Sequence, residues 1–181
     1  MVKIIFSLLC IMASLSLRKK GIKLFQNDDD YTTPKYVWKM LDGIIDKNAV
    51  IYDPYYNKGE TKQYLTELGY KNVIHYKEDF YTNHHKYTYD IILTNPPYSN
   101  KKKVFTALKQ IDKPFIVIMP VSTITKKFTR DIFMDKLQLL IPPKRMQFEK
   151  NGINNKRCWF DTLFLAYKMN LPKDITFLPS S

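Results

Sequence analysis

A candidate binding loop is formed by four consecutive residues, Asn95, Pro96, Pro97 and Tyr98. The amide oxygen of Asn95 and the carbonyl of Pro96 can each accept one hydrogen of an exocyclic amine, and the ring of Tyr98 can stack on the group that carries it. Both prolines lack an N–H donor and fix φ, so the backbone of this loop is rigid. The stretch therefore predicts a site for a planar amine; the alternative interpretation is a proline-rich turn without function.

The loop follows an apolar run at residues 91–93, which predicts a strand that is buried on both faces and ends at Asn95. Further strands are predicted at 49–53, 72–76 and 114–119, with a closing antiparallel pair at 137–141 and 158–167. Between them lie helical patterns: Thr33 can cap a helix that begins at Pro34, Gly69 ends a second, and residues 101–103 begin a third. The alternation predicts an α/β fold with a mostly parallel sheet.

A second loop with possible chemistry lies earlier in the chain. The predicted strand that ends at Asp53 runs into Pro54 and Tyr55, and the residues Asn57 and Gly59 then lead into a helix. In doubly wound sheets, nucleotides bind at the loop of such a strand–loop–helix unit. Asparagine is the non-glycine residue that best tolerates positive φ, so a tight turn can form at Asn57.

These motifs resemble those of the N6-adenine-specific DNA methyltransferases, a family of S-adenosylmethionine-dependent amino-methyltransferases. The loop at 95–98 resembles motif IV, and the segment 53–59 resembles motif I, in which a glycine stands at the position of Asn57. Two further matches are Asp79-Phe80 with motif III and Thr33-Pro34 with motif X, whose alternative interpretation is a capped amphipathic helix. The resemblance covers residues 31–170.

The resemblance implies a Rossmann-like class I methyltransferase fold, a mostly parallel central sheet with an antiparallel closing hairpin. Because residues 81–88 show no apolar period, we expect this sheet to be trimmed at one edge. The implied cofactor is S-adenosyl-L-methionine, with contacts from Thr33, Pro34, Asp53, Pro54, Tyr55, Asn57, Gly59, Asp79 and Phe80. The acid that holds the cofactor ribose in this family has no clear counterpart, and Glu78 is the candidate substitute.

The implied reaction is methyl transfer to adenine N6 in DNA, with Asn95, Pro96, Pro97 and Tyr98 as the catalytic loop. Such a transfer depends on positioning and electrostatics, so neither a general base nor a metal ion is expected. Three other activities stay open: methylation of RNA at adenine N6 or guanine N2, methylation of a protein glutamine amide, and nucleic-acid binding without catalysis.

Positive charge is concentrated after the Asn-Pro-Pro-Tyr loop. Residues 101–181 carry 16 basic and 6 acidic residues, whereas residues 31–100 carry 8 of each. This asymmetry favours a nucleic-acid partner but does not separate DNA from RNA; the preference for DNA over RNA is what the resemblance implies. The candidate substrate-binding residues are Lys102, Lys144, Arg145 and Arg157, with Phe148 and then Trp159 as the aromatic that sandwiches the target base. The chain has little room for a recognition region, so we expect weak sequence specificity or a specificity-conferring partner subunit.

The chain is expected to divide into an N-terminal apolar segment with a polar linker (1–30), a catalytic domain (31–170) and a C-terminal tail (171–181). Residues 4–17 are apolar and flanked by basic residues, which allows a signal or anchor, a helix docked on the domain, or a dispensable extension. Membrane contact is expected only if this segment is retained. Two cysteines form neither a disulfide framework nor a metal-binding pattern, which favours a cytoplasmic or nuclear location.

Overall fold

The computed structural model describes residues 31–134, 136–150, 153–154 and 160–180, and its centre is a seven-stranded sheet. The strands are β1 (Val50–Tyr52), β2 (Asn72–Ile74), β3 (Ile91–Thr94), β4 (Phe115–Pro120), β5 (Leu137–Ile141), β8 (Thr162–Tyr167) and β9 (Ile175–Phe177). Their order in the sheet is β2-β1-β3-β4-β8-β5-β9. Strands β2, β1, β3 and β4 are parallel, and β8 is antiparallel to both of its neighbours, β4 and β5.

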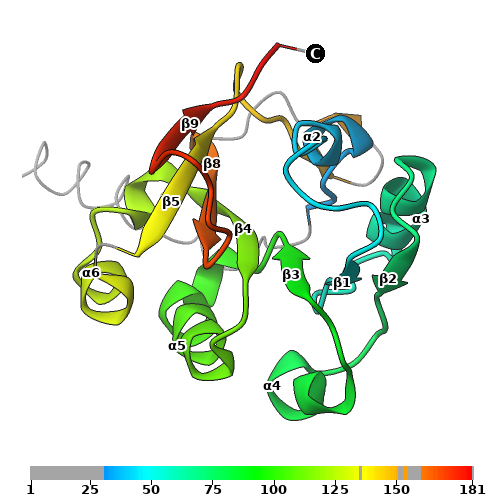
Figure 1. Ribbon diagram of the computed structural model, residues 1–181, viewed down its shortest axis with the longest axis horizontal. Coiled ribbons are helices and arrows are strands. Elements are labelled where there is room, and N and C mark those ends of the chain that lie inside the picture. The colour runs from blue at the N-terminus through cyan, green and yellow to red at the C-terminus, as the bar shows by residue number, and fades with distance from the viewer. Residues whose placement is uncertain (1–30, 135, 151–152, 155–159, 181) are drawn as a thin grey trace, which may run out of the picture.

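Helices cover both faces of this sheet (Figure 1). They are α2 (Lys35–Lys39), α3 (Glu60–Glu67), α4 (Phe80–Asn83), α5 (Lys101–Ile111) and α6 (Lys127–Phe133), with short 3-10 turns at His84–Lys86, Tyr98–Asn100 and Val121–Thr123. Helices α2 and α3 pack on one face, and α4, α5 and α6 pack on the other. The predicted Rossmann-like α/β architecture is therefore confirmed.

Burial of β3 and β4 on both faces explains why their sequences are continuous apolar runs. In β3, Ile91 and Leu93 join the core beneath α2 and α3, whereas Ile92 joins the core beneath α5. Side chains alternate between the two faces of a strand, so a strand covered on both faces needs apolar residues at every position. All residues of β3 and β4 are buried, which confirms these two predicted strands.

The chain moves in opposite directions along the sheet from β1 and from β3. After β1 it passes through α3 to β2, which is one edge of the sheet, and after β3 it passes through α5 to β4. The carboxyl ends of β1 and β3 therefore lie at a topological switch point, where open α/β sheets bind ligands. Within the described residues, the chain that leads from β1 to β3 contains one strand, β2, which forms an edge of the sheet. The predicted trimmed edge is therefore also confirmed.

Three local predictions differ from the structure. The Thr33 side chain does not cap α2, whose N-cap is Pro34; its hydroxyl instead accepts a hydrogen bond from Asn95. Helix α4 forms where the sequence shows no apolar period, because the Asp79 side chain caps it by accepting from the backbone N–H of Thr82. Strand β9 lies in the expected tail and pairs with β5.

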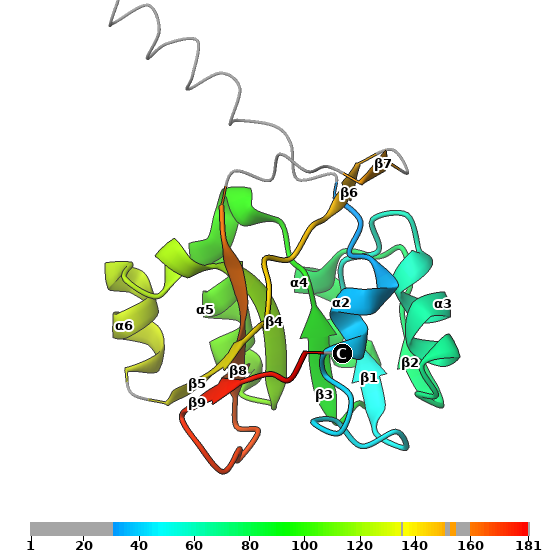
Figure 2. The same ribbon diagram turned by 90° about the horizontal axis from the view of Figure 1, so that it is seen from above.

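A small hairpin lies beside the stretch that precedes α2 (Figure 2). Strands β6 (Glu149–Lys150) and β7 (Ile153–Asn154) pair antiparallel, and Glu149 also forms an isolated bridge with Thr32, just before α2. The stretch before α2 is thereby attached to the loop between β5 and β8. Among the residues described, no helix has the length and apolar character needed to cross a membrane.

Candidate active site

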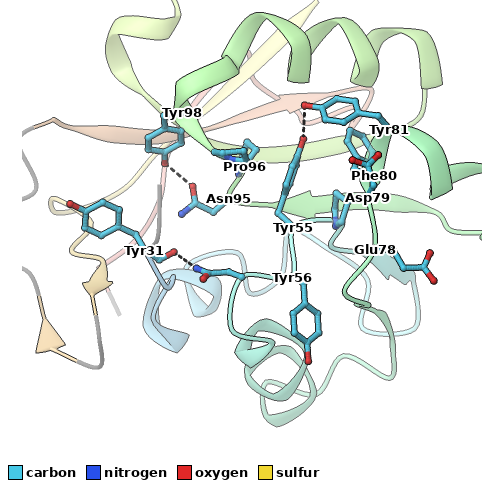
Figure 3. A pocket seen from close by; sticks show the side chains of 13 residues that line it. Tyr31, Tyr55, Tyr56, Glu78, Asp79, Phe80, Tyr81, Asn95, Pro96 and Tyr98 are labelled. Atoms are coloured by element: carbon cyan, nitrogen blue, oxygen red, sulfur yellow. Dashed lines mark hydrogen bonds between the residues drawn. The ribbon is translucent and has the colours of Figure 1, made fainter. Parts of the chain in front are cut away.

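A cavity of about 420 Å³ opens at the carboxyl ends of β1, β2 and β3 (Figure 3). It is lined by Tyr31, Pro54, Tyr55, Tyr56, Asn57, Glu78, Asp79, Phe80, Tyr81, Asn95, Pro96, Pro97 and Tyr98. Residues of the predicted motifs I, III and IV thus share one cavity, although they are up to 44 positions apart in the chain. The fold brings them together because three neighbouring parallel strands end at the same edge of the sheet.

Asp53 and Thr33 line a smaller hollow beside this cavity rather than the cavity itself. Asp53 is 2% exposed, and its Oδ1 accepts hydrogen bonds from Thr94 Oγ1 at 2.5 Å and from the backbone N–H of Tyr55 at 3.3 Å. Burial raises the pKa of the Asp53 carboxyl, and the neighbouring His75 opposes this effect. Through its hydrogen bond with the Tyr55 N–H, Asp53 stabilises the loop that follows β1.

The loop after β1 contains two left-handed residues, as its sequence predicts. Asn57 has φ of 45° and Gly59 has φ of 84°. The N–H of Gly59 donates to the carbonyl of Tyr56 at 2.7 Å, and a Cβ on Gly59 would lie 2.6 Å from the Tyr56 hydroxyl oxygen. Gly59 therefore allows a close approach that any side chain would block. It does not itself line the cavity, and neither does Pro34.

The wall opposite Asn95 is aromatic and acidic (Figure 3). Phe80 packs against Tyr55 with ring centroids 5.5 Å apart, and the Tyr55 and Tyr81 hydroxyls lie 3.3 Å apart. Burial raises the pKa of Tyr55, and the hydrogen bond with Tyr81 raises it further, so its phenol is neutral. Asp79 Oδ1 accepts from the N–H and hydroxyl of Thr82; among the described residues, no hydrogen bond engages Oδ2. A flat ring with a polar edge suits this wall.

Asn95 lies at the other end of the cavity, and two hydroxyl groups hold its side chain. Its Nδ2 donates to Thr33 Oγ1 at 3.0 Å, and its Oδ1 accepts from the Tyr98 hydroxyl at 2.7 Å (Figure 3). The Tyr98 ring meets Phe160 edge to face, with centroids 5.4 Å apart and an interplanar angle of 74°. The predicted amine acceptor thus faces the cavity in hydrogen-bonded contact with the predicted stacking residue.

The predicted substrate-binding residues that the structure describes lie outside the cavity lining. Lys102, Lys144 and Arg145 are exposed, and Arg145 forms an ion pair with Asp161 at 3.0 Å. The prediction for Phe148 is wrong: its side chain is 2% exposed and packs in the core beneath α2 and α3, so its ring is not available to a base. The predicted Arg157 and Trp159 are outside the described residues.

Three tyrosines of the cavity lining were not predicted from the sequence. Tyr31, Tyr56 and Tyr81 come from the segment before α2, from the β1 loop and from α4. Tyr56 stacks on His75, with ring centroids 4.9 Å apart. Aromatic residues next to Asp-Pro and Asp-Phe were the available signal, but thirteen tyrosines in the chain make each one a weak indicator. Glu78, the candidate substitute acid, also lines the cavity.

No protein-family model matches this chain, and no curated protein matches it in sequence. Among solved structures, it aligns with a protein from Listeria monocytogenes described as a class I S-adenosylmethionine-dependent methyltransferase, at 13% identity and a TM-score of 0.47, over 87% of this chain and 68% of that one. It also aligns with TrmN from Thermus thermophilus, at 12% identity and a TM-score of 0.35, over 72% and 40%. At such identities, neither likeness says what this chain binds.

Proposed function

We propose that this protein transfers a methyl group from S-adenosylmethionine to an exocyclic amine of a nucleic-acid base, with adenine N6 in DNA as the first candidate. The observation that carries the proposal is the shared cavity: the two amine acceptors, Asn95 Oδ1 and the Pro96 carbonyl, belong to the same space as the loop after β1 and the Asp79-Phe80 corner. Cofactor and target amine can therefore meet at the switch point of the sheet.

The residues present fit the cofactor. A volume of about 420 Å³ lies within the range of small-ligand pockets. Asp79 Oδ2 offers an acceptor for the adenine amine, and Glu78 offers an acceptor for the ribose hydroxyls. Phe80 is 2% exposed and supports this wall by packing against Tyr55. Tyr31 and Tyr55 offer aromatic surface, which attracts a cationic group. When bound, S-adenosylmethionine supplies a methyl group on a positively charged sulfur.

The role of the chain's own residues follows from the electronics of the target amine. The lone pair of an aromatic amine is delocalised into its ring and is a poor nucleophile. Asn95 Oδ1 and the Pro96 carbonyl can accept its two hydrogens and favour a tetrahedral nitrogen, which localises the lone pair. Asn95 Oδ1 becomes available when the Tyr98 hydroxyl moves away, and the Tyr98 ring can then stack on the base. Positioning the nitrogen about 3 Å from the methyl carbon supplies most of the acceleration.

Charge supports a polyanionic substrate. Helix α5 begins directly after the Asn-Pro-Pro-Tyr loop with Lys101, Lys102 and Lys103, although lysines at a helix N-terminus oppose the macrodipole. Among the described residues, neither Lys102 nor Lys103 forms an ion pair, and Lys103 lies over the ring of Tyr81 at 3.7 Å. Phosphates beside an extruded base would neutralise this cluster.

The test has two measurements. Isothermal titration with S-adenosylmethionine asks whether the cavity binds the cofactor, and labelled-methyl transfer to DNA, RNA and protein asks which polymer is modified. Recovery of labelled N6-methyladenine from DNA is the expected result. Label in RNA or in glutamine would change the proposed substrate and keep the proposed reaction, and cofactor binding without label in any of the three polymers would contradict methyl transfer to them. Absence of cofactor binding would refute the proposal.

A further inference from the structure

Residues 31–33, termed here the 31–33 strap, connect the two halves of the candidate active site. The Tyr31 carbonyl accepts a hydrogen bond from Asn57 Nδ2 at 2.6 Å, in the loop after β1 (Figure 3). Thr32 pairs with Glu149 through both backbone groups, at 2.9 and 3.0 Å. The Thr33 hydroxyl accepts from Asn95 Nδ2 at 3.0 Å. The strap therefore contacts the loop after β1 at one end and the Asn-Pro-Pro-Tyr loop at the other.

Asn57 adopts a backbone conformation that glycine adopts without strain and that asparagine tolerates best among the other residues. With φ at 45°, its position favours glycine, because side chains are strained in the left-handed region. Asparagine tolerates this conformation, but it is not needed to form the turn, since glycine adopts it at lower cost. The hydrogen bond to Tyr31, in contrast, requires the side-chain amide, and glycine cannot make it.

The contact has a direct consequence for the cavity. Tyr31 and Asn57 both line it, so the hydrogen bond between them joins two parts of its wall. Asn57 is exposed and contributes nothing to the apolar core, whereas Thr32 and Thr33 are 7% and 5% exposed. Loss of the Asn57 amide would thus remove one of the contacts that hold the Tyr31 end of the strap and leave the domain folded.

We propose that Asn57 is a positioning residue: its amide holds the 31–33 strap against the cofactor cavity and, through Thr33, supports the orientation of the Asn95 amide. The expected effect on cofactor binding rests on the proposed function. The contact between Asn57 and the strap does not depend on it. The asparagine at a glycine-favouring position is then explained by the contact it makes and not by the turn.

The decisive variant is Asn57→Gly, because it removes the amide and relaxes the backbone at once. A hydrogen bond is worth about 0.5–1.5 kcal/mol, so we expect the dissociation constant for S-adenosylmethionine to rise about 2- to 13-fold. Hydrogen exchange of the Thr32 and Thr33 amides should become faster, while the melting temperature stays equal or rises. The matched control is Asn170→Gly, an exposed asparagine with φ of 51° outside the cavity, which should change neither cofactor affinity nor strap exchange.

A turn-forming role alone predicts the opposite pattern. Asn57→Gly would then bind the cofactor as tightly as the wild type, with unchanged exchange in the strap, and the proposal would be overturned. Asn57→Asp gives a second test, because aspartate keeps the shape but places an acceptor opposite the Tyr31 carbonyl; it should be at least as impaired as glycine. If the wild type binds no S-adenosylmethionine, the proposed function fails, and faster strap exchange in Asn57→Gly still supports the contact.

Discussion

Replacing Asn95 by alanine should lower kcat by about 10² to 10³, while the dissociation constant for S-adenosylmethionine changes only a few-fold. The amide offers one of two acceptors to the target amine, and removal of one preorganised polar group at a reacting centre typically costs about 2.7–4 kcal/mol of transition-state stabilisation. Cofactor affinity is preserved because the Asn95 side chain bonds to Thr33 and Tyr98, on the far side of the cavity from Asp79 and Phe80.

The same substitution also has a structural cost that must be separated from the catalytic one. It removes two partly buried hydrogen bonds, worth about 1–3 kcal/mol together. Single-turnover methyl transfer should therefore be measured well below the melting temperature, with cofactor titration as the check on folding. Asn100→Ala is the matched control, because this exposed asparagine has no side-chain hydrogen bond at the α5 N-cap. Wild-type turnover in Asn95→Ala would refute the proposed mechanism.

Three further outcomes are expected. Replacing Lys144 and Arg145 with glutamine should weaken nucleic-acid binding and reduce the slope of log K against log salt by about one unit per lost phosphate contact; an unchanged slope would place the interface elsewhere. The ammonium of Lys168, 2.6 Å from Asp112 Oδ2, lowers the pKa of that carboxyl to about 2. Its contribution to the free energy of unfolding is therefore complete above its ordinary pKa of 3.8 and is lost as the pH falls through about 2, so urea titrations of wild type and Asp112→Asn should converge in that range, and a constant difference would contradict the linkage. Methylation of a random-sequence DNA library should show preference only for bases flanking the target, whereas a motif of four or more bases from the isolated chain would contradict the expected weak specificity.

The sheet was predictable from the sequence where burial leaves a strong local signal. Strands β3 and β4 are buried on both faces, so nearly every position is apolar and the run is visible without tertiary information. Helix α5 begins at the predicted residues 101–103, and it buries Val104, Phe105 and Leu108 on one face. Strand β9 gave no such signal, because its Ile175 and Phe177 are exposed and only its backbone joins the sheet.

The loops that carry the candidate site were predictable from the sequence, whereas the contacts between these loops and distant segments were not. Asn95 and Asp79 stand directly after predicted strands, and the sheet brings their loops together. Phe148 was misplaced because basic neighbours make it look exposed, whereas the pairing of Glu149 with Thr32 holds this segment against the core. The contacts of Thr33 with Asn95 and of Asn57 with Tyr31 join residues 62 and 26 positions apart, and no local pattern encodes such pairs.

Strand β8 has a consequence for how the chain folds during synthesis. It lies between β4 and β5 and pairs with both, although it follows β5 in the chain by 20 residues. Strand β5 therefore has no partner in the sheet until residues 162–167 have left the ribosome. The parallel half, β2-β1-β3-β4, can assemble earlier, but until then the backbone edge of β4 that later pairs with β8 has no hydrogen-bonding partner. We expect nascent chains that stop before β8 to expose this edge and to depend on chaperones, because an unpaired apolar strand edge promotes aggregation.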